Sequence, residues 1–220
     1  MLPVELALPF HGRWVTQNSP ANRVPSHGTD LFGSSHAIDF VRVDARGLSG
    51  ARTWRTLVAT EPPGTFLGIV APTAGVVHAV HDGEEDHEAR RSQLLLIGYA
   101  LTQARRARHG SAGLAGNHVV IALAEGGPYV LLAHLRRGSV AVTPGQRVEV
   151  GSVVGACGNS GNSTEPHVHV QVSDSIAWDR ARGLPMTFRR PGTQETFVPR
   201  NGEIVAGARP DERGSPRPTA

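Results

Sequence analysis

The sequence predicts a mainly β protein, an antiparallel sandwich or barrel of short strands. Glycine (26 residues) and proline (16) are frequent in the 220-residue chain and punctuate short runs of Val, Ile and Thr, a pattern typical of strands joined by tight turns. The hydrophobic content of 39% suits one soluble core, and no apolar run is long enough to cross a bilayer. Because aromatic residues make up only 5%, we expect aliphatic side chains to fill this core.

The strand signals follow one another along the chain. A short strand is expected near the N-terminus, before a polar loop at 17–22. The next signal, Ala37 to Val43, combines β-branched and aromatic residues. Residues 64–80 alternate glycine-bearing turns with β-branched residues. Further strands are predicted at 118–122, 129–134, 147–150, 153–156 and 167–172.

Between about 82 and 116 the pattern predicts a helical insertion. Leu94, Ile97, Leu101 and Ala104 repeat at spacings of three and four residues, which is typical of an amphipathic helix. We therefore expect three parts: a strand-and-loop extension at 1–26, a domain at 27–206 that contains the insertion, and a disordered tail at 207–220 whose polar composition gives it nothing to bury.

Charge and cysteine content narrow the function classes. The net charge is only +3, and acidic and basic residues are mixed along the chain, so no phosphate-binding stripe is predicted and we expect no nucleic-acid partner. The single cysteine, Cys157, excludes an internal disulfide and is expected to be a small buried residue. No signal peptide is recognisable at the N-terminus, which leaves the localisation open between the cell envelope and the cytoplasm.

His167 and His169 lie two positions apart in an alternating apolar run. A strand turns successive side chains to opposite faces, so these two imidazoles share one face, about 7 Å apart along the strand. Two imidazoles presented together can form part of a metal site. Alone, such a pair is equally compatible with a solvated face.

Four segments in order strengthen the metal interpretation. They are the histidines and Asp39 within 27–39, the strands Gly116–Ile121 and Tyr129–Leu135, the stretch Pro144–Gly155, and the glycine-rich turn into Pro-His-Val-His at 158–169. This ordered set resembles the M23 family of zinc metallopeptidases, the lysostaphin-like and LytM-like peptidoglycan endopeptidases. The likeness extends from about His27 to Val172 and implies an antiparallel sheet of the duplicated-hybrid-motif type, with zinc in a groove.

The resemblance also implies residue roles. Asp39 and His169 match zinc ligands of the family, and His134 and His167 match the two histidines that flank the metal-bound water. Such a site meets the needs of hydrolysis, because a catalytic zinc takes three protein ligands and leaves one position for water. One neighbouring histidine can then accept a proton and the other can stabilise an oxyanion.

The first ligand departs from the family spacing, because Ser35 stands four residues before Asp39 where a histidine is usual. Two candidates compete. If 35–39 is a regular strand, His36 and Asp39 face opposite sides, whereas His27 needs only a loop, which 28–33 is suited to form. We therefore favour His27 over His36. If neither binds, the site is degenerate.

The sequence predicts a zinc-dependent endopeptidase acting on peptides of peptidoglycan, with His27, Asp39 and His169 as ligands and His134 and His167 as catalytic groups. The main alternative is an inactive M23-like module that binds peptidoglycan or a partner protein. A third candidate is a cytosolic hydrolase acting on another peptide. Glu165 replaces the glycine that the family has before Pro-His, either harmlessly or by narrowing the groove.

Overall fold

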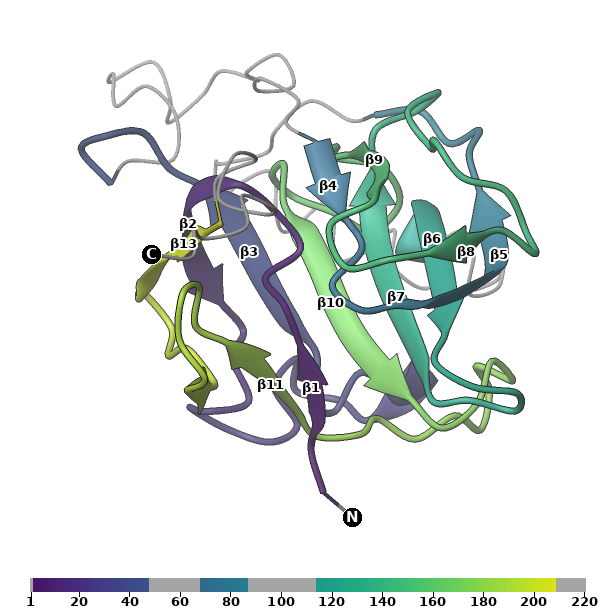
Figure 1. The fold of residues 1–220 in the computed structure, drawn as a ribbon, viewed down its shortest axis with the longest axis horizontal. Coiled ribbons are helices and arrows are strands. Elements are labelled where there is room, and N and C mark those ends of the chain that lie inside the picture. The colour runs from purple at the N-terminus through teal and green to yellow at the C-terminus, as the bar shows by residue number, and fades with distance from the viewer. Residues whose placement is uncertain (1, 48–67, 87–113, 209–220) are drawn as a thin grey trace, which may run out of the picture.

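The structure is a computed structural model that describes residues 2–47, 68–86 and 114–208 (Figure 1). Its elements are almost all strands, with one 3-10 helix, η1 (Leu31–Gly33). The strands are β1 (Val4–Leu6), β2 (Gly12–Gln17), β3 (Ile38–Arg42), β4 (Gly68–Val70), β5 (Gly75–His81), β6 (Asn117–Ala122), β7 (Tyr129–Leu135), β8 (Arg147–Val148), β9 (Val153–Ala156), β10 (Val168–Ser173), β11 (Met186–Arg189), β12 (Thr196–Phe197) and β13 (Ile204–Gly207).

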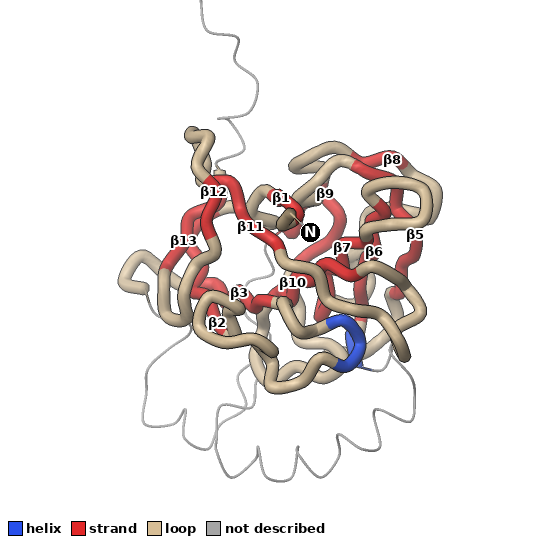
Figure 2. Tube along the Cα trace, turned by 90° about the horizontal axis from the view of Figure 1, so that it is seen from below, coloured by secondary structure: helices blue, strands red, loops and turns tan. Residues whose placement is uncertain are grey.

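The main layer is an eight-stranded antiparallel sheet in the order β13-β2-β3-β10-β7-β6-β5-β8. Figure 2 shows that the sheet is curled, with β13 and β2 near one end and β5 and β8 at the other. Two smaller sheets, β1-β11-β12 and β4-β9, complete the fold. The predicted mainly β, antiparallel class is confirmed, with one difference: β1 pairs with β11 in parallel.

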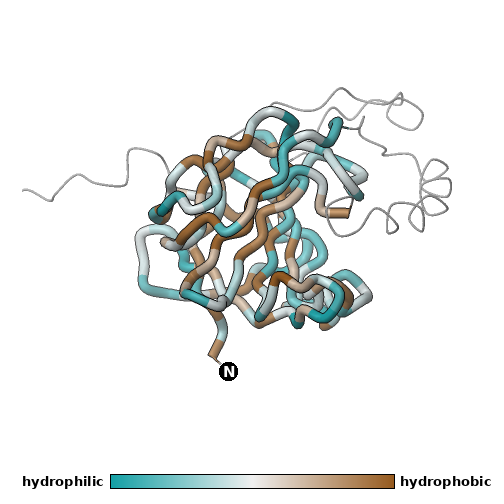
Figure 3. The backbone as a smooth tube through the Cα atoms, turned by 90° about the vertical axis from the view of Figure 1, so that its right-hand side faces the viewer, coloured by the Kyte–Doolittle hydropathy of each residue, from teal (hydrophilic) through white to brown (hydrophobic). Residues whose placement is uncertain are grey.

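One face of the large sheet packs on the main hydrophobic core, and we call the opposite face the site face. Along β10, Val168, Val170 and Val172 enter the core, so the residues between them lie on the site face. Figure 3 shows hydrophobic stretches along the strands and hydrophilic stretches in many connecting loops. Cys157 is buried in the core, and burial raises the pKa of its thiol to about 12.

The expectation of an aliphatic core was incomplete. Four aromatic side chains, each at most 1% exposed, are among the largest fully buried residues. Phe10 stacks on Trp14 with ring centroids 4.6 Å apart, and Phe40 meets the edges of Phe10 and Phe188. The low aromatic content did not reveal this, because composition does not show that these four aromatic residues pack together near β2, β3 and β11.

The predicted and observed elements agree for most of β3 to β10. The sequence analysis missed β11, β12 and β13, which are two to four residues long. Most of the predicted helical insertion, 87–113, and most of the predicted tail, 209–220, lie outside the described residues. The proposed N-terminal extension at 1–26 includes β2, which pairs with β3 and β13 inside the large sheet.

Candidate functional site

Asp39 and His169 lie opposite each other on the neighbouring strands β3 and β10. Their chain neighbours enter the core, so both side chains extend from the site face. His169 Nδ1 is 2.9 Å from Asp39 Oδ1, and the Asp39 side chain is 8% exposed. A carboxylate so deeply buried needs positive or hydrogen-bonding partners around it.

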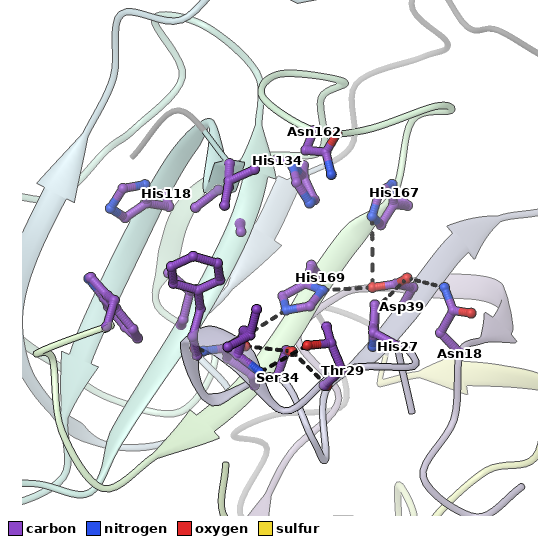
Figure 4. A pocket seen from close by; sticks show the side chains of 18 of the residues that line it. Asn18, His27, Thr29, Ser34, Asp39, His118, His134, Asn162, His167 and His169 are labelled. Carbon is purple, nitrogen blue, oxygen red and sulfur yellow. Dashed lines mark hydrogen bonds and ion pairs between the residues drawn. The ribbon is translucent and has the colours of Figure 1, made fainter. Parts of the chain in front are cut away.

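His27 reaches the same carboxylate from the loop between β2 and β3. Its Nε2 is 3.0 Å from Asp39 Oδ2, and its ring centroid is 4.9 Å from that of His169. The Nδ1 atom of His27 is 3.0 Å from Ser26 Oγ, which itself donates to the carbonyl oxygen of Ser34. This second contact orients the His27 ring with Nε2 toward Asp39, as Figure 4 shows.

His134 reaches the site face because β7 carries a bulge. Two steps along β6, from Asn117 to Val119, correspond to three along β7, from Leu135 to Leu132. The extra residue breaks the alternation, and His134 adopts a left-handed backbone with φ of 61°. A non-glycine residue in this region is uncommon, and such conformations cluster at functional sites. His134 therefore lines the same cavity as Ala133, its neighbour in sequence.

His134 and His167 are adjacent, with ring centroids 4.6 Å apart. Each has its Nδ1 atom near a backbone carbonyl oxygen, of Ser160 at 2.9 Å and of Glu165 at 2.8 Å respectively. Because a carbonyl can only accept, Nδ1 carries the proton in both neutral rings, and Nε2 keeps its lone pair. His167 Nε2 lies 3.7 Å from Asp39 Oδ1 (Figure 4).

The glycine-rich turn before His167 allows the chain to pass close to β6. Gly161 has a left-handed φ of 68°, and a Cβ atom there would lie 2.4 Å from the backbone nitrogen of Gly116. No side chain fits in that space. The turn thereby places the Ser160 carbonyl oxygen within hydrogen-bond distance of His134 Nδ1.

Burial and the Asp39 carboxylate together determine the protonation of the site residues. Burial alone would raise the pKa of Asp39, but the charge of His167 and hydrogen bonds from His169 and His27 hold it well below its ordinary value. Burial would lower the pKa of His169, yet its hydrogen bond and charge interaction with Asp39 raise it. For His134, burial and the charges of His167 and His169 all lower the pKa, well below its usual range. The neutral form of His134 is therefore favoured.

His27, Asp39 and His169 fit a divalent metal ion. Within the described parts of the chain they form the one group of three or more such side chains able to hold one, with all ligand atoms within 4.8 Å of one another. Four-coordinate zinc with ligands at about 2.1 Å places neighbouring donors roughly 3.4 Å apart. Two imidazole nitrogens and one carboxylate oxygen are a common catalytic set for this metal.

The sequence model of peptidase family M23 matches residues 98–180. This range includes His134, His167 and His169. This segment is similar to peptidase family M23. The resemblance stated from the motifs is confirmed, and it supports a peptidase, a hydrolase of peptide bonds. The match covers less than half of the chain and leaves out His27 and Asp39.

Several solved structures are similar to this chain. The catalytic domain of an A109H mutant of EnpA, a prophage-encoded M23 protein from Enterococcus faecalis, is 20% identical over 70% of this chain and 78% of its own, with a TM-score of 0.38. The catalytic domain of lysostaphin from Staphylococcus simulans is 16% identical over 79% and 88%, with a TM-score of 0.38. The M23 metalloprotease Pseudoalterin, from the deep sea, is 12% identical over 95% of this chain and 97% of its own, with a TM-score of 0.43. Identities of 20% or less and TM-scores below 0.5 are too low to indicate a shared activity.

The other candidate for the first ligand, His36, is not part of the group formed by His27, Asp39 and His169. Residues 35 and 36 form a turn before β3 instead of extending it, so the strand parity used to compare the candidates does not apply there. His36 Nδ1 is 3.1 Å from Ser35 Oγ. Of the two candidates, His27 lines the cavity.

Glu165, the residue of the glycine-rich turn that departs from the family pattern, accepts a hydrogen bond from Gln17 Nε2 at 3.1 Å. Its backbone carbonyl also accepts from His167 Nδ1 and Ser163 Oγ. The residues that line the cavity do not include Glu165. Its contacts connect the turn to β2.

Two polar residues of the candidate site were missed by the sequence analysis. Asn18 Nδ2 donates to Asp39 Oδ2 at 2.7 Å, a contact that no spacing rule predicts. Gln171 Oε1 lies 3.0 Å from His169 Nε2. Strand alternation could have found Gln171, which is two residues after His169 and therefore on the same face.

The site opens into a cavity of about 600 Å³. Beyond the metal-ligand cluster its wall includes apolar residues, among them Phe32, Leu131 and Trp178. His118 stands at this other part of the wall, away from His167 and Asp39 (Figure 4). Burial lowers the pKa of His118, and its Nδ1 donates to the Gly116 carbonyl at 2.7 Å. The cavity thus joins a polar end to an apolar end.

Proposed function

We propose that the protein is a zinc-dependent metalloendopeptidase that hydrolyses peptide bonds in the stem or cross-bridge peptides of peptidoglycan. The observation that carries the proposal is the convergence of His27, Asp39 and His169 beside the histidine pair 134 and 167. The match to the M23 family supports the peptidase activity, and the resemblance in the motifs supports the choice of substrate. We further propose that 27–206 is the catalytic domain.

His27 Nε2, Asp39 and His169 Nδ1 would hold the metal. Zinc bound there would supply a Lewis acid and would lower the pKa of a coordinated water to about 7. Asn18 and the buried setting would keep the Asp39 carboxylate ionised and in place. His169 must lose its Nδ1 proton to act as a ligand.

His134 and His167 would manage the protons of the reaction. Each presents an unprotonated Nε2 while Nδ1 is held by a backbone carbonyl. One of them accepts a proton from the attacking water as the new C–O bond forms. That proton passes to the amine nitrogen as the C–N bond breaks. The second imidazole takes up a proton from solvent at Nε2 before the step, donates a hydrogen bond from it to the oxyanion, and keeps it when the carbonyl re-forms. Atoms balance as one water consumed per peptide bond cleaved.

Cleavage of a defined substrate tests this function. Zinc-loaded protein is incubated with purified peptidoglycan and with matched synthetic stem and cross-bridge peptides, and new amino termini are quantified by mass spectrometry. We expect cleavage that a chelator abolishes and added zinc restores. Zinc-loaded protein that binds peptidoglycan without releasing new termini would instead identify the non-catalytic module. The joint presence of Asp39, His134, His167 and His169 favours the enzyme over the non-catalytic module.

The stabilisation by zinc is expected to grow with pH. In the metal-free protein the raised pKa of His169 contributes stability that is present below about pH 6.5 and lost as pH rises through the folded value. The lowered pKa of Asp39 contributes stability above about pH 4, which is lost only at lower pH. Because zinc competes with the His169 proton, the Tm increase on adding zinc should be small near pH 5.5 and large near pH 8. A Tm increase that is the same at both pH values would contradict this.

A further inference from the structure

The ring of His169 has both nitrogens engaged. Nδ1 faces Asp39 Oδ1 at 2.9 Å, on the side where the proposed metal would bind, and Nε2 faces Gln171 Oε1 at 3.0 Å. An imidazole that ligates through Nδ1 must carry its proton on Nε2. The group that holds the proton on His169 Nε2 is therefore the one that contacts this nitrogen, Gln171.

The orientation of the Gln171 amide follows from its second contact. Its Nε2 lies 2.9 Å from the carbonyl oxygen of Phe32. A backbone carbonyl can only accept, so the amide nitrogen must face Phe32 and the amide oxygen must face His169. The oxygen can only accept in turn, so His169 Nε2 has to be the donor. Gln171 is 3% exposed, so solvent is largely kept from substituting for either partner.

The Gln171 amide also binds the connection between β2 and β3 through the Phe32 carbonyl. Phe32 belongs to η1 and has a left-handed φ of 58°. Its neighbour Gly33, at φ of 74°, packs so closely on β10 that a Cβ atom would lie 3.2 Å from the Cβ of Ser173. This segment belongs to the β2–β3 connection that also carries His27. Gln171 thus links the strand of one proposed ligand to the loop of the other.

We propose that Gln171 is a positioning residue that holds His169 in its Nε2-protonated form and joins β10 to the loop carrying His27, so that the two histidine ligands are prearranged for the metal. This inference rests on the proposed metal site and extends it. Outer hydrogen-bond partners of metal-bound histidines typically change metal affinity about 10- to 100-fold when they are removed. Gln171 is expected to fall in this range.

Wild-type protein provides the first test. Protein labelled with ¹⁵N-histidine and loaded with zinc alone is studied by long-range ¹H–¹⁵N NMR, with His169 assigned by its absence in His169→Ala. We expect His169 to be protonated at Nε2, with its proton protected from exchange. A proton on Nδ1, or an Nε2 proton that exchanges freely, would overturn the proposal.

Two variants separate positioning from simple support of the fold. Gln171→Leu removes both contacts, whereas Gln171→Glu keeps an acceptor for His169 but places a second carboxylate oxygen against the Phe32 carbonyl. Both should lower the Tm of the metal-free protein. Zinc affinity should fall about 10- to 100-fold in Gln171→Leu and stay close to wild type in Gln171→Glu.

Ser173→Ala is the matched control. Ser173 is also buried on β10 and donates to the Ser175 carbonyl at 3.0 Å, without a recorded contact to His169. It should lower the Tm and leave zinc affinity unchanged. Wild-type affinity in Gln171→Leu, or equal losses in the two Gln171 variants, would overturn the positioning role while the metal site stands. Failure of the wild type itself to take up zinc would overturn the proposed function as well.

Discussion

Replacing His169 by alanine is expected to remove zinc binding and peptidase activity together. The variant keeps two of the three proposed protein ligands, His27 and Asp39, and leaves the buried carboxylate with fewer partners. A catalytic zinc held by two protein ligands should be lost on dialysis. Metal content by mass spectrometry and cleavage of the peptide substrate are measured on the same samples.

His78→Ala is the control for this loss. His78 is exposed on β5 and its ring packs against Tyr129, outside the residues that line the cavity. It should retain zinc and activity. If His169→Ala kept a full equivalent of zinc, the ligand assignment would be wrong.

Replacing His134 or His167 should leave zinc in place and slow catalysis by about 10²- to 10⁴-fold, the usual contribution of a positioned acid or base. Neither belongs to the group His27, Asp39 and His169 that could hold the metal, so the proposed ligand set stays intact in both variants. The loss should appear in kcat more than in KM, because these groups act in the transition state. Steady-state kinetics on zinc-loaded samples measure it.

The His134 variant needs care because its backbone is left-handed. Asparagine tolerates this conformation better than alanine, so His134→Asn keeps the bulge and His134→Ala serves as its comparison. Loss of zinc in both His134→Asn and His167→Ala would mean that ligands and catalytic residues have been exchanged in this account.

The fold was predictable from the sequence where strands are long and alternating. The segments 37–43, 129–134 and 167–172 were each predicted within one residue or so of β3, β7 and β10. β12, of two residues, and β13, of four, carry too little pattern to be recognised. The parallel pairing of β1 with β11 joins segments about 180 residues apart, and no local signal encodes it.

The candidate site was predictable in part. Alternation placed His167 and His169 on one face, and both line the cavity. The position of His134 could not be derived from alternation, because the bulge in β7 changes the face of the sheet to which the His134 side chain points. The choice of His27 over His36 stays a prediction. Of the two, His27 lines the cavity, but the parity argument behind the choice assumed a strand where the chain forms a turn. Asn18 meets Asp39 only through the folded β2–β3 connection.

The central claim is a single zinc held by His27, Asp39 and His169. Its most direct test is the zinc content per chain of the purified wild type beside His27→Ala and His36→Ala, after loading with zinc and removal of excess. We predict about one zinc per chain in the wild type and in His36→Ala, and a large loss in His27→Ala. Zinc retained in His27→Ala, or absent from the wild type, would contradict the account.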